Sequence, residues 1–358
     1  MKIIDIYILK RYLATFFVML LLFIPIGIMI DVSEKVDKMI EREVPFAKIA
    51  SYYFDFTFYF ANFLFPIFLF LSVIWFTSKL ANNTEIIAIL SSGISFSRFL
   101  RPYLVGAAIV AVLAFIMGMF VVPSASKGYN EFRYKYLKKN AKDRETTNLF
   151  NQLNDNDYIY VSSFEPNNKI GYNFTLEHFE GTELKYKLSA KNIRWVEKDS
   201  VYRLSSYTKR IIGERNDSVI TERRIDTLFN FNLDDLTPVS YIAETKNLFE
   251  LTSFIDKEKQ KGSSNVARYQ LVLYRRWSLP IAAFILTIIA VSVSSMKRRG
   301  GMGVNLALGI FIAFIFIFFD KVFGTMAERA GFSPLLAVIL PNFIFGTLAV
   351  YLLKNAKR

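Results

Sequence analysis

A multi-pass α-helical membrane protein with one inserted antiparallel β domain is the fold class that the sequence predicts. Three long apolar segments precede residues 123–273, and three more follow them. Residues 123–273 are more polar and contain short stretches in which apolar and polar residues alternate. The 358-residue chain is 53% hydrophobic. Its apolar runs are long enough to cross a hydrocarbon core of ~30 Å at ~1.5 Å per helical residue.

We expect each apolar segment to form one membrane-spanning helix. The six predicted spans are residues 12–30, 52–78, 103–122, 277–295, 304–319 and 335–353. The second span is long enough to tilt or to continue beyond the bilayer. The first span lacks an early small-residue cleavage site, so we expect a retained helix rather than a signal peptide.

Basic residues in the short loops predict the orientation of the spans. One set of loops contains Lys2, Lys10, Arg11, Lys79, Arg98, Arg101, Lys297, Arg298, Arg299, Lys354, Lys357 and Arg358. The opposite set contains Lys35, Lys38, Arg42, Lys48, Lys321 and Arg329, interleaved with acidic residues. Because lysine and arginine accumulate on the cytoplasmic side, we expect both termini to be cytoplasmic and residues 123–273 to be external. The net charge of +13 then reflects the cationic flanks of the spans rather than nucleic-acid binding.

Motifs for enzymatic chemistry are missing from the sequence. It contains no G-x-x-x-x-G-K-[ST] phosphate loop, no G-x-S-x-G elbow and no H-E-x-x-H metal motif. The chain has no cysteine, and His178, its one histidine, lies in a strand-like stretch without other ligands. We therefore predict no catalytic residue, no metal site and no cofactor, and we expect any ATP hydrolysis to occur on another chain.

Residues 157–249 have the pattern of a small all-β domain. Apolar and polar residues alternate at 158–161, 172–176, 184–188 and 201–204, with turn residues at 155–157, 166–168, 180–182, 197–199 and 215–217. This spacing predicts an antiparallel sandwich or jelly roll with one buried face. That face is either a dry core or an apolar groove for acyl chains, and the pattern fits both.

The predicted domain order follows from these segments. Residues 1–122 and 274–358 form the membrane part, and residues 123–273 form the β domain. Linkers are expected at residues 143–147 and 256–265.

A short helix is predicted after the second span, at about residues 82–93. Asn82 is placed to cap its start, Glu85 would complete a capping box, and Gly93 suits a left-handed stop. The segment is more apolar than a solvated connector requires. Two interpretations stay open: a connector at the membrane surface, or a coupling helix that docks on a cytoplasmic partner. The candidate contact residues of a coupling helix are Glu85, Ile86, Ile89, Leu90 and Gly93.

Basic residues also follow the first span in helical register. Lys35, Lys38 and Arg42 fall at positions i, i+3 and i+7, so they share one helix face. One interpretation is an exposed extension whose charges pair with acidic neighbours. The other is a cationic row that binds phosphates of an amphiphile headgroup, which Lys321 at the end of the fifth span would join.

The segment order and three motifs resemble the LptF/LptG permeases of the lipopolysaccharide export transporter. Glu85 with Ser-Gly-Ile-Ser at 92–95 is similar to the coupling segment of that family. Arg-Tyr-Gln-Leu at 268–271 is similar to the motif with which LptG re-enters the membrane. Residues 302–304 and 318–324 are similar to the fifth span of the family. The resemblance covers nearly the whole chain and is closer to LptG.

The resemblance implies one half of an ABC exporter in the bacterial inner membrane, with the β-jelly roll in the periplasm. A second LptF/LptG-type permease would complete a lipid cavity, and an LptB-like ATPase dimer would bind the coupling helices from the cytoplasm. The expected cargo is lipopolysaccharide, taken from the outer leaflet of the inner membrane. It would pass through the β domain to LptC/LptA-like jelly-roll proteins.

Another class of function stays open: a mechanotransmitting permease that regulates a periplasmic partner and moves no lipid. Photocrosslinkers at Lys35, at Lys38 and in the β domain distinguish the two. Transport predicts ATP-dependent lipopolysaccharide adducts in the β domain, and the alternative predicts protein adducts only. Secondary transport is disfavoured because it requires ionisable groups near mid-membrane. The predicted spans contain few such groups, and Asp55 lies near an outer end.

Overall fold

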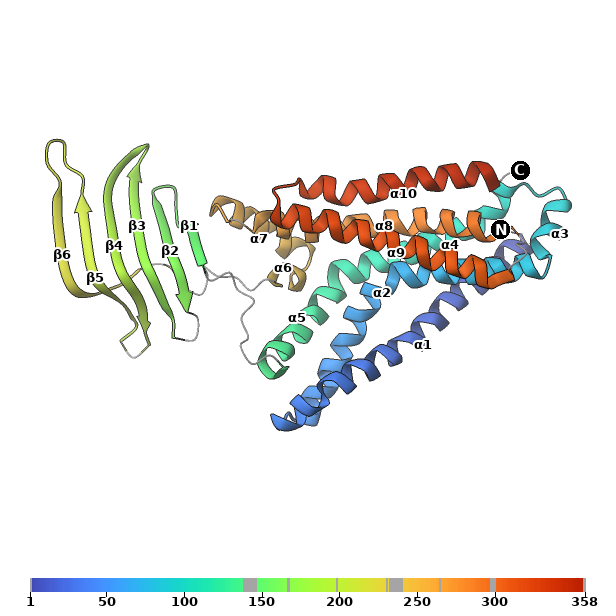
Figure 1. Cartoon of the computed structure of the whole chain (residues 1–358), viewed down its shortest axis with the longest axis horizontal. Helices are drawn as coiled ribbons and strands as arrows, with labels where there is room; N and C mark the ends of the chain where they lie inside the picture. The colour runs from blue at the N-terminus through green and yellow to red at the C-terminus, as the bar shows by residue number, and fades with distance from the viewer. Residues whose placement is uncertain are drawn as a thin grey trace. The chain divides into compact units, whose positions relative to one another are not determined.

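The computed structural model of the chain divides into two compact units (Figure 1). One unit contains Met1–Lys139, Glu244–Leu251 and Ala267–Arg358, and the other contains Asn140–Ala243 and Thr252–Val266. The first unit is helical, and the second is built mainly from β-strands. The structure describes residues 2–137, 147–165, 168–197, 199–229, 231, 241–263, 265–296 and 301–356.

Within the described residues, six helical segments are long and apolar enough to cross a membrane. They are α1 (Ile3–Glu41), α2 (Phe46–Asn82), the segment from α4 (Phe96–Ile116) through α5 (Val122–Phe132), α8 (Val266–Ser294), α9 (Gly301–Arg329) and α10 (Pro334–Ala356). Two π-helical turns, η1 (Met117–Val121) and η2 (Arg133–Leu137), flank α5. Each predicted span falls within one of these segments, to within one residue, so the six-span prediction is confirmed.

The membrane helices extend beyond the predicted apolar runs. Helix α1 has 39 residues. At ~1.5 Å per residue, that is about twice the thickness of a ~30 Å hydrocarbon core. The helix ends at Glu41, so Lys35 and Lys38 lie within it, beyond the predicted apolar run. The third helical segment runs to Leu137, so the predicted boundary at residue 123 falls inside it.

Close approaches and buried hydrogen bonds join the helices of the membrane unit. A Cβ on Gly106 of α4 would lie 2.3 Å from Tyr12 Cε1 of α1, so the two helices are in tight contact there. Asn305 of α9 donates a hydrogen bond from Nδ2 to Ser78 Oγ of α2 at 3.1 Å, and both residues are buried. Because lipid tails are as apolar as leucine, contacts of this kind specify which membrane helices pair.

The second unit contains one antiparallel sheet whose described strands follow chain order. The strands are β1 (Thr147–Gln152), β2 (Asp157–Glu165), β3 (Ile170–Glu180), β4 (Glu183–Val196), β5 (Val201–Ile211) and β6 (Ser218–Thr227). The predicted insertion of an antiparallel β domain is confirmed. In the described strands the topology is an up-and-down meander, without the crossed connections of Greek keys. Tight turns such as the one at Gly181 (φ +65°) produce this order because they join adjacent strands directly.

The two faces of the sheet differ in polarity. Val161 lies opposite Phe174, and Ile193 lies opposite Leu204; all four side chains have 0% exposure. Successive residues of a strand point to opposite faces, so the neighbours of these core residues lie on the other, polar face. The sheet therefore has an apolar face that forms its core and a polar face that is exposed.

Three segments differ from the expected pattern. Residues 256–265, predicted as a linker, overlap helix α7 (Leu248–Gln260). Helix α6 (Ile242–Thr245) lies where the strand pattern was expected to continue to residue 249. Strand β1 begins at Thr147, the last residue of the other predicted linker.

Local capping explains the unexpected helix α7. The Glu250 N–H donates to Asn247 Oδ1 at 2.9 Å, and the Asn247 N–H donates to Glu250 Oε2 at 3.1 Å. This reciprocal pair is a capping box, which satisfies free N–H groups at a helix start. Leu251 and Ile255, four residues apart, are both buried, as one face of a helix requires.

Some predicted features lie outside the described residues. They are linker residues 143–146 and 264, turn residues 166–167 and 198, the end of the strand region at 230 and 232–240, and the basic residues Lys297, Arg298, Arg299, Lys357 and Arg358.

Candidate functional site

The predicted coupling segment contains a short helix, α3 (Glu85–Ser91), between α2 and α4. Its predicted cap is wrong, because α2 continues through Asn82 and no side-chain cap hydrogen bond forms at Thr84, which precedes α3. A helical Asn82 cannot serve as an N-cap, which needs non-helical dihedral angles. Gly93 has a φ of +85°, the left-handed conformation predicted for the stop.

Two donors from outside α3 orient the Glu85 carboxylate. Asn83 Nδ2 donates to Glu85 Oε1 at 3.1 Å, and Tyr7 Oη of α1 donates to Glu85 Oε2 at 3.2 Å. Tyr7 was missed by the sequence reasoning. It lies 78 residues from Glu85, and no local pattern connects the two positions.

The apolar residues of α3 divide between the protein core and the surface. Ile86 is 2% exposed and belongs to the core of the membrane unit, against which Ile89 and Leu90 also pack. Ile87 is 54% exposed, and Gly93 is also exposed. Three of the predicted contact residues thus hold α3 onto its own chain, and Ile87 is the large apolar side chain on its free face.

The start of α1 also contacts the start of α4. Asp5 Oδ2 accepts a hydrogen bond from Arg98 Nη2 at 2.6 Å and one from the Lys2 N–H at 2.7 Å. Asp5 is only 5% exposed. Together with the Tyr7–Glu85 bond, this ion pair ties α1 to the first residue of α3 and to the start of α4.

Of the predicted headgroup-binding residues, Lys35 is paired inside the chain. Its Nζ contacts Asp31 Oδ1, donates to Tyr52 Oη at 3.1 Å and lies 5.8 Å from the centre of the Tyr52 ring. Tyr52 Oη in turn donates to Asp31 Oδ2 at 3.0 Å. The charge of Lys35 is therefore already balanced by a carboxylate that is itself buried.

The other predicted headgroup residues lie in two places. Lys38 is exposed on α1, and Arg42 caps the C-terminal end of the same helix. Lys321 is exposed on α9, with its Nζ 5.9 Å from the centre of the Phe63 ring. Within the described residues, no ion pair or ring contact joins Lys321 to Lys35, Lys38 or Arg42 of α1.

Lys321 instead belongs to a cluster of charges around Glu244. The other cations whose charges act on this carboxyl are Arg268, Arg275 and Arg276 of α8. Arg276 Nη1 donates to the Lys246 carbonyl at 2.8 Å, which holds the segment before α7 against α8. The Glu244 side chain is exposed at the surface, yet the protein atoms packed around it raise the pKa of its carboxyl, and the four cations oppose that rise. We call this set the Glu244 cluster.

A second contact fixes Arg275 within the Glu244 cluster. Its Nη2 donates to the Asp320 carbonyl at 3.0 Å and lies 3.1 Å from Asp320 Oδ2. The same guanidinium packs over Gly324, where a Cβ would lie 2.2 Å from Nη2. The one sign of this cluster in the sequence is the pair of adjacent arginines, Arg275 and Arg276, directly before the fourth apolar run.

These features define a class of protein: a multi-pass membrane protein with an inserted β domain and an anchored short helix between its second and third membrane helices. The family described as Lipopolysaccharide export system permease LptF/LptG matches residues 6–355, and the chain belongs to this family. It is accordingly a multi-pass protein of the inner membrane.

Two curated relatives are permeases of the same export system. The chain is 21% identical over 278 residues to the lipopolysaccharide export system permease protein LptG of Escherichia coli strain K12, across 76% of each protein. It is 21% identical over 298 residues to the LptG protein of Haemophilus influenzae strain KW20 Rd, across 78% of each. Both names agree with the resemblance of the motifs to LptG.

Proposed function

We propose that the chain is one permease subunit of an ABC transporter that extracts lipopolysaccharide from the outer leaflet of the inner membrane. A separate cytoplasmic ATPase dimer of the LptB kind drives it, and a second LptF/LptG-type permease completes the lipid cavity. The observation that carries the proposal is the anchoring of α3, which presents Glu85 and Ile87 while its other apolar residues hold it to the membrane helices.

The proposed orientation follows the basic residues. Both termini and α3 are cytoplasmic, and the β unit is periplasmic. Lys79, Arg98 and Arg101 beside α3 support this placement, because short cytoplasmic loops are enriched in lysine and arginine.

Helix α1 is the proposed path for force between the two sides. Its first turns contact Glu85 and Arg98, and its last turns contain Asp31 and Lys35. Helix α1 is helical from Ile3 to Glu41, with Pro25 interrupting its hydrogen-bond ladder between the two ends, and a displacement at α3 is transmitted along it to the outer end.

The proposed headgroup contacts combine the α1 row with the Glu244 cluster. Phosphate groups are bound by the ammonium groups of Lys38 and Lys321, which act as point charges, and by the forked guanidinium of Arg42. The arginines of α8 support this binding with their positive charge. Lys35 also contacts the phosphate when the phosphate displaces Asp31 from the Lys35 ammonium group. Acyl chains then pass to the apolar face of the β unit. The outermost strands of the described sheet, β1 and β6, are the proposed edges on which LptC/LptA-like partners pair.

Substitution of Glu85 tests the coupling proposal. Glu85→Gln should weaken binding of the co-expressed ATPase by ~30-fold or more, because removing one partner of a buried interfacial charge pair costs about 2–5 kcal/mol. Glu85→Arg should abolish co-purification. Glu41→Gln, the same change at the opposite end of α1, is the matched control. Undiminished ATPase binding and export in both Glu85 variants would remove Glu85 from this role.

A further inference from the structure

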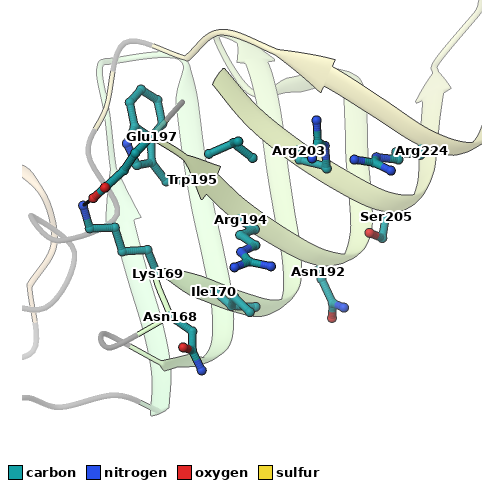
Figure 2. Close-up of a pocket in the computed structure, with 11 residues that line it drawn as sticks. Asn168, Lys169, Ile170, Asn192, Arg194, Trp195, Glu197, Arg203, Ser205 and Arg224 are labelled. Carbon is teal, nitrogen blue, oxygen red and sulfur yellow. Dashed lines mark hydrogen bonds and ion pairs between the residues drawn. The ribbon is translucent and has the colours of Figure 1, made fainter. Parts of the chain in front are cut away.

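The polar face of the β unit contains a hollow of about 740 Å³ that the proposed coupling and headgroup sites do not use. Figure 2 shows its lining, which comes from β3, β4, β5 and β6 and the adjoining turns. A volume of this size is typical of a site for a small molecule. Three arginines, Arg194, Arg203 and Arg224, face it together with Asn192 and Ser205.

Strand register arranges these side chains in two parallel rows. In the first row, Arg194 lies directly opposite Arg203 on the next strand. In the second row, Ser205 lies between Asn192 on one side and Arg224 on the other. Directly opposed residues of antiparallel strands project from the same face, so all five share the polar face.

The arginines of the hollow are unequally neutralised. Arg203 donates from Nε and Nη2 to the two carboxylate oxygens of Asp226, each at 2.8 Å, and the guanidinium lowers the pKa of Asp226. No such carboxylate partner occurs for Arg194 or Arg224 within the described part of the chain, although the charge of Arg224 also acts on Asp226. Arg203 Nη2 also lies 3.7 Å from Asp199 Oδ2, so the charge of Arg203 is balanced within the chain, and Arg194 and Arg224 are the cations of the hollow that an added anion would meet.

An unsatisfied acceptor accompanies this excess of positive charge. Asn192 Oδ1 is buried and has no hydrogen-bond partner within the described residues. A buried amide oxygen without a partner costs free energy, which a hydroxyl group of a ligand would recover. At the rim, Lys169 Nζ and Glu197 Oε1 form an ion pair at 2.6 Å, so they add little net charge.

We infer that the hollow binds an anionic saccharide, a sugar that bears a phosphate or carboxylate group. Guanidinium forks match such oxyanions, and the amide of Asn192 and hydroxyl of Ser205 match sugar hydroxyls. This site involves neither the ATPase contact nor the membrane helices; where the sugar is part of lipopolysaccharide, the site deepens the proposed function and rests on it. The anionic sugar belongs either to a lipid-linked glycan or to a free soluble compound.

Intrinsic fluorescence of the full-length protein in detergent tests the inference. The chain has three tryptophans, so Trp75→Phe and Trp277→Phe leave Trp195, which lines the hollow, as the only one. We expect glucose 1-phosphate to change this signal in a saturable way and glucose to leave it unchanged. Calorimetry with the same two compounds repeats the measurement without relying on the tryptophan.

Matched substitutions assign the binding to the hollow. Arg194→Gln and Arg224→Gln should each weaken the affinity for glucose 1-phosphate by about tenfold or more, the effect of losing one charged hydrogen bond. Arg223→Gln removes the same charge one residue away, on the opposite face of β6, and should leave the affinity unchanged. Equal losses in all three variants, or no saturable binding by either method, would overturn the inference.

Competition identifies the source of the sugar. Displacement of glucose 1-phosphate by purified lipopolysaccharide indicates a lipid-linked glycan, and lack of displacement indicates a soluble ligand; both results support the site. Binding of a glutamate-rich peptide where glucose 1-phosphate fails would replace the saccharide by an acidic protein partner. Because no ATPase is present, these results do not depend on the coupling role of Glu85.

Discussion

At the scale of single residues, the Glu85 carboxylate is oriented before any partner binds it. Both of its oxygens accept hydrogen bonds, one from a residue two positions away and one from α1. A side chain held in this way loses less conformational entropy on docking. Tyr7 is therefore a positioning residue, because its hydroxyl group holds the Glu85 carboxylate in place.

Tyr7→Phe removes that hydroxyl and keeps the ring. We expect ATPase binding to weaken by about two- to tenfold, because one hydrogen bond contributes about 0.5–1.5 kcal/mol. The variant should retain its thermal midpoint, as should Tyr351→Phe, an exposed tyrosine on α10 that serves as control.

A double-mutant cycle separates positioning from a general structural effect. In the Glu85→Gln background, Tyr7→Phe should have no further effect on ATPase binding. An equal additional loss in that background would show that Tyr7 acts independently of Glu85.

The raised pKa of Glu244 gives a prediction about pH. Its carboxyl takes up a proton at a higher pH than an ordinary glutamate, so acidification from pH 7.5 removes a negative charge from among four cations. Binding of an alkyl sulfate, whose own charge is constant, should therefore tighten on acidification by up to about fivefold, the effect of one charge at ~4 Å in water.

Glu244→Gln should bind the alkyl sulfate tightly at both pH values and lose this dependence. Glu328→Gln, an exposed glutamate at the end of α9, should keep it. An unchanged pH profile in Glu244→Gln would assign the titration to another group.

At the scale of helices and strands, long apolar runs and strict alternation predict elements well. The six spans and strands β2 to β5 follow from such patterns, since each repeats over many residues. Short elements depend on one or two contacts. The Asn247–Glu250 capping box was readable in the sequence, whereas the failure of Asn82 as a cap depends on where α2 ends.

Contacts between elements were beyond sequence reasoning. Asp31 lies four residues before Lys35, a spacing at which opposite charges pair on a helix, so this ion pair is predictable from the sequence. The hydrogen bonds of Tyr52 to both residues depend on how α1 packs against α2. The Tyr7–Glu85 and Asp5–Arg98 contacts likewise exist only after three helices meet. One sequence without its tertiary packing does not specify such pairs.

The tight crossing of α1 and α4 predicts the effect of Gly106→Ala. Its new Cβ would lie 2.3 Å from Tyr12 Cε1, so we expect a destabilisation of about 1–3 kcal/mol from overpacking. Gly118→Ala is a matched control, because the nearest atom to its Cβ, Asn62 Oδ1, is 3.9 Å away. Thermal unfolding in detergent should show a lower midpoint for Gly106→Ala alone; equal midpoints would contradict the tight contact.

At the scale of the whole molecule, the proposed function assigns energy input to the membrane unit at α3 and cargo handling to the cavity and the β unit. The membrane unit contains the anchored α3, the continuous α1 and the Glu244 cluster, and the β unit contains an apolar face and a polar face. Membership of the LptF/LptG family accounts for this combination. The central claim is that ATP hydrolysis on a partner moves lipopolysaccharide onto the apolar face of the β unit through Glu85.

Photocrosslinking at Ile225, which lies opposite Leu204 on that apolar face and is only half-buried, tests the claim most directly. The chain with p-benzoylphenylalanine at this position is reconstituted with its partner permease, the ATPase and lipopolysaccharide, with and without ATP. The account predicts a lipopolysaccharide adduct that requires ATP and is lost in Glu85→Arg. An adduct that forms equally without ATP, or one with protein only, would contradict it.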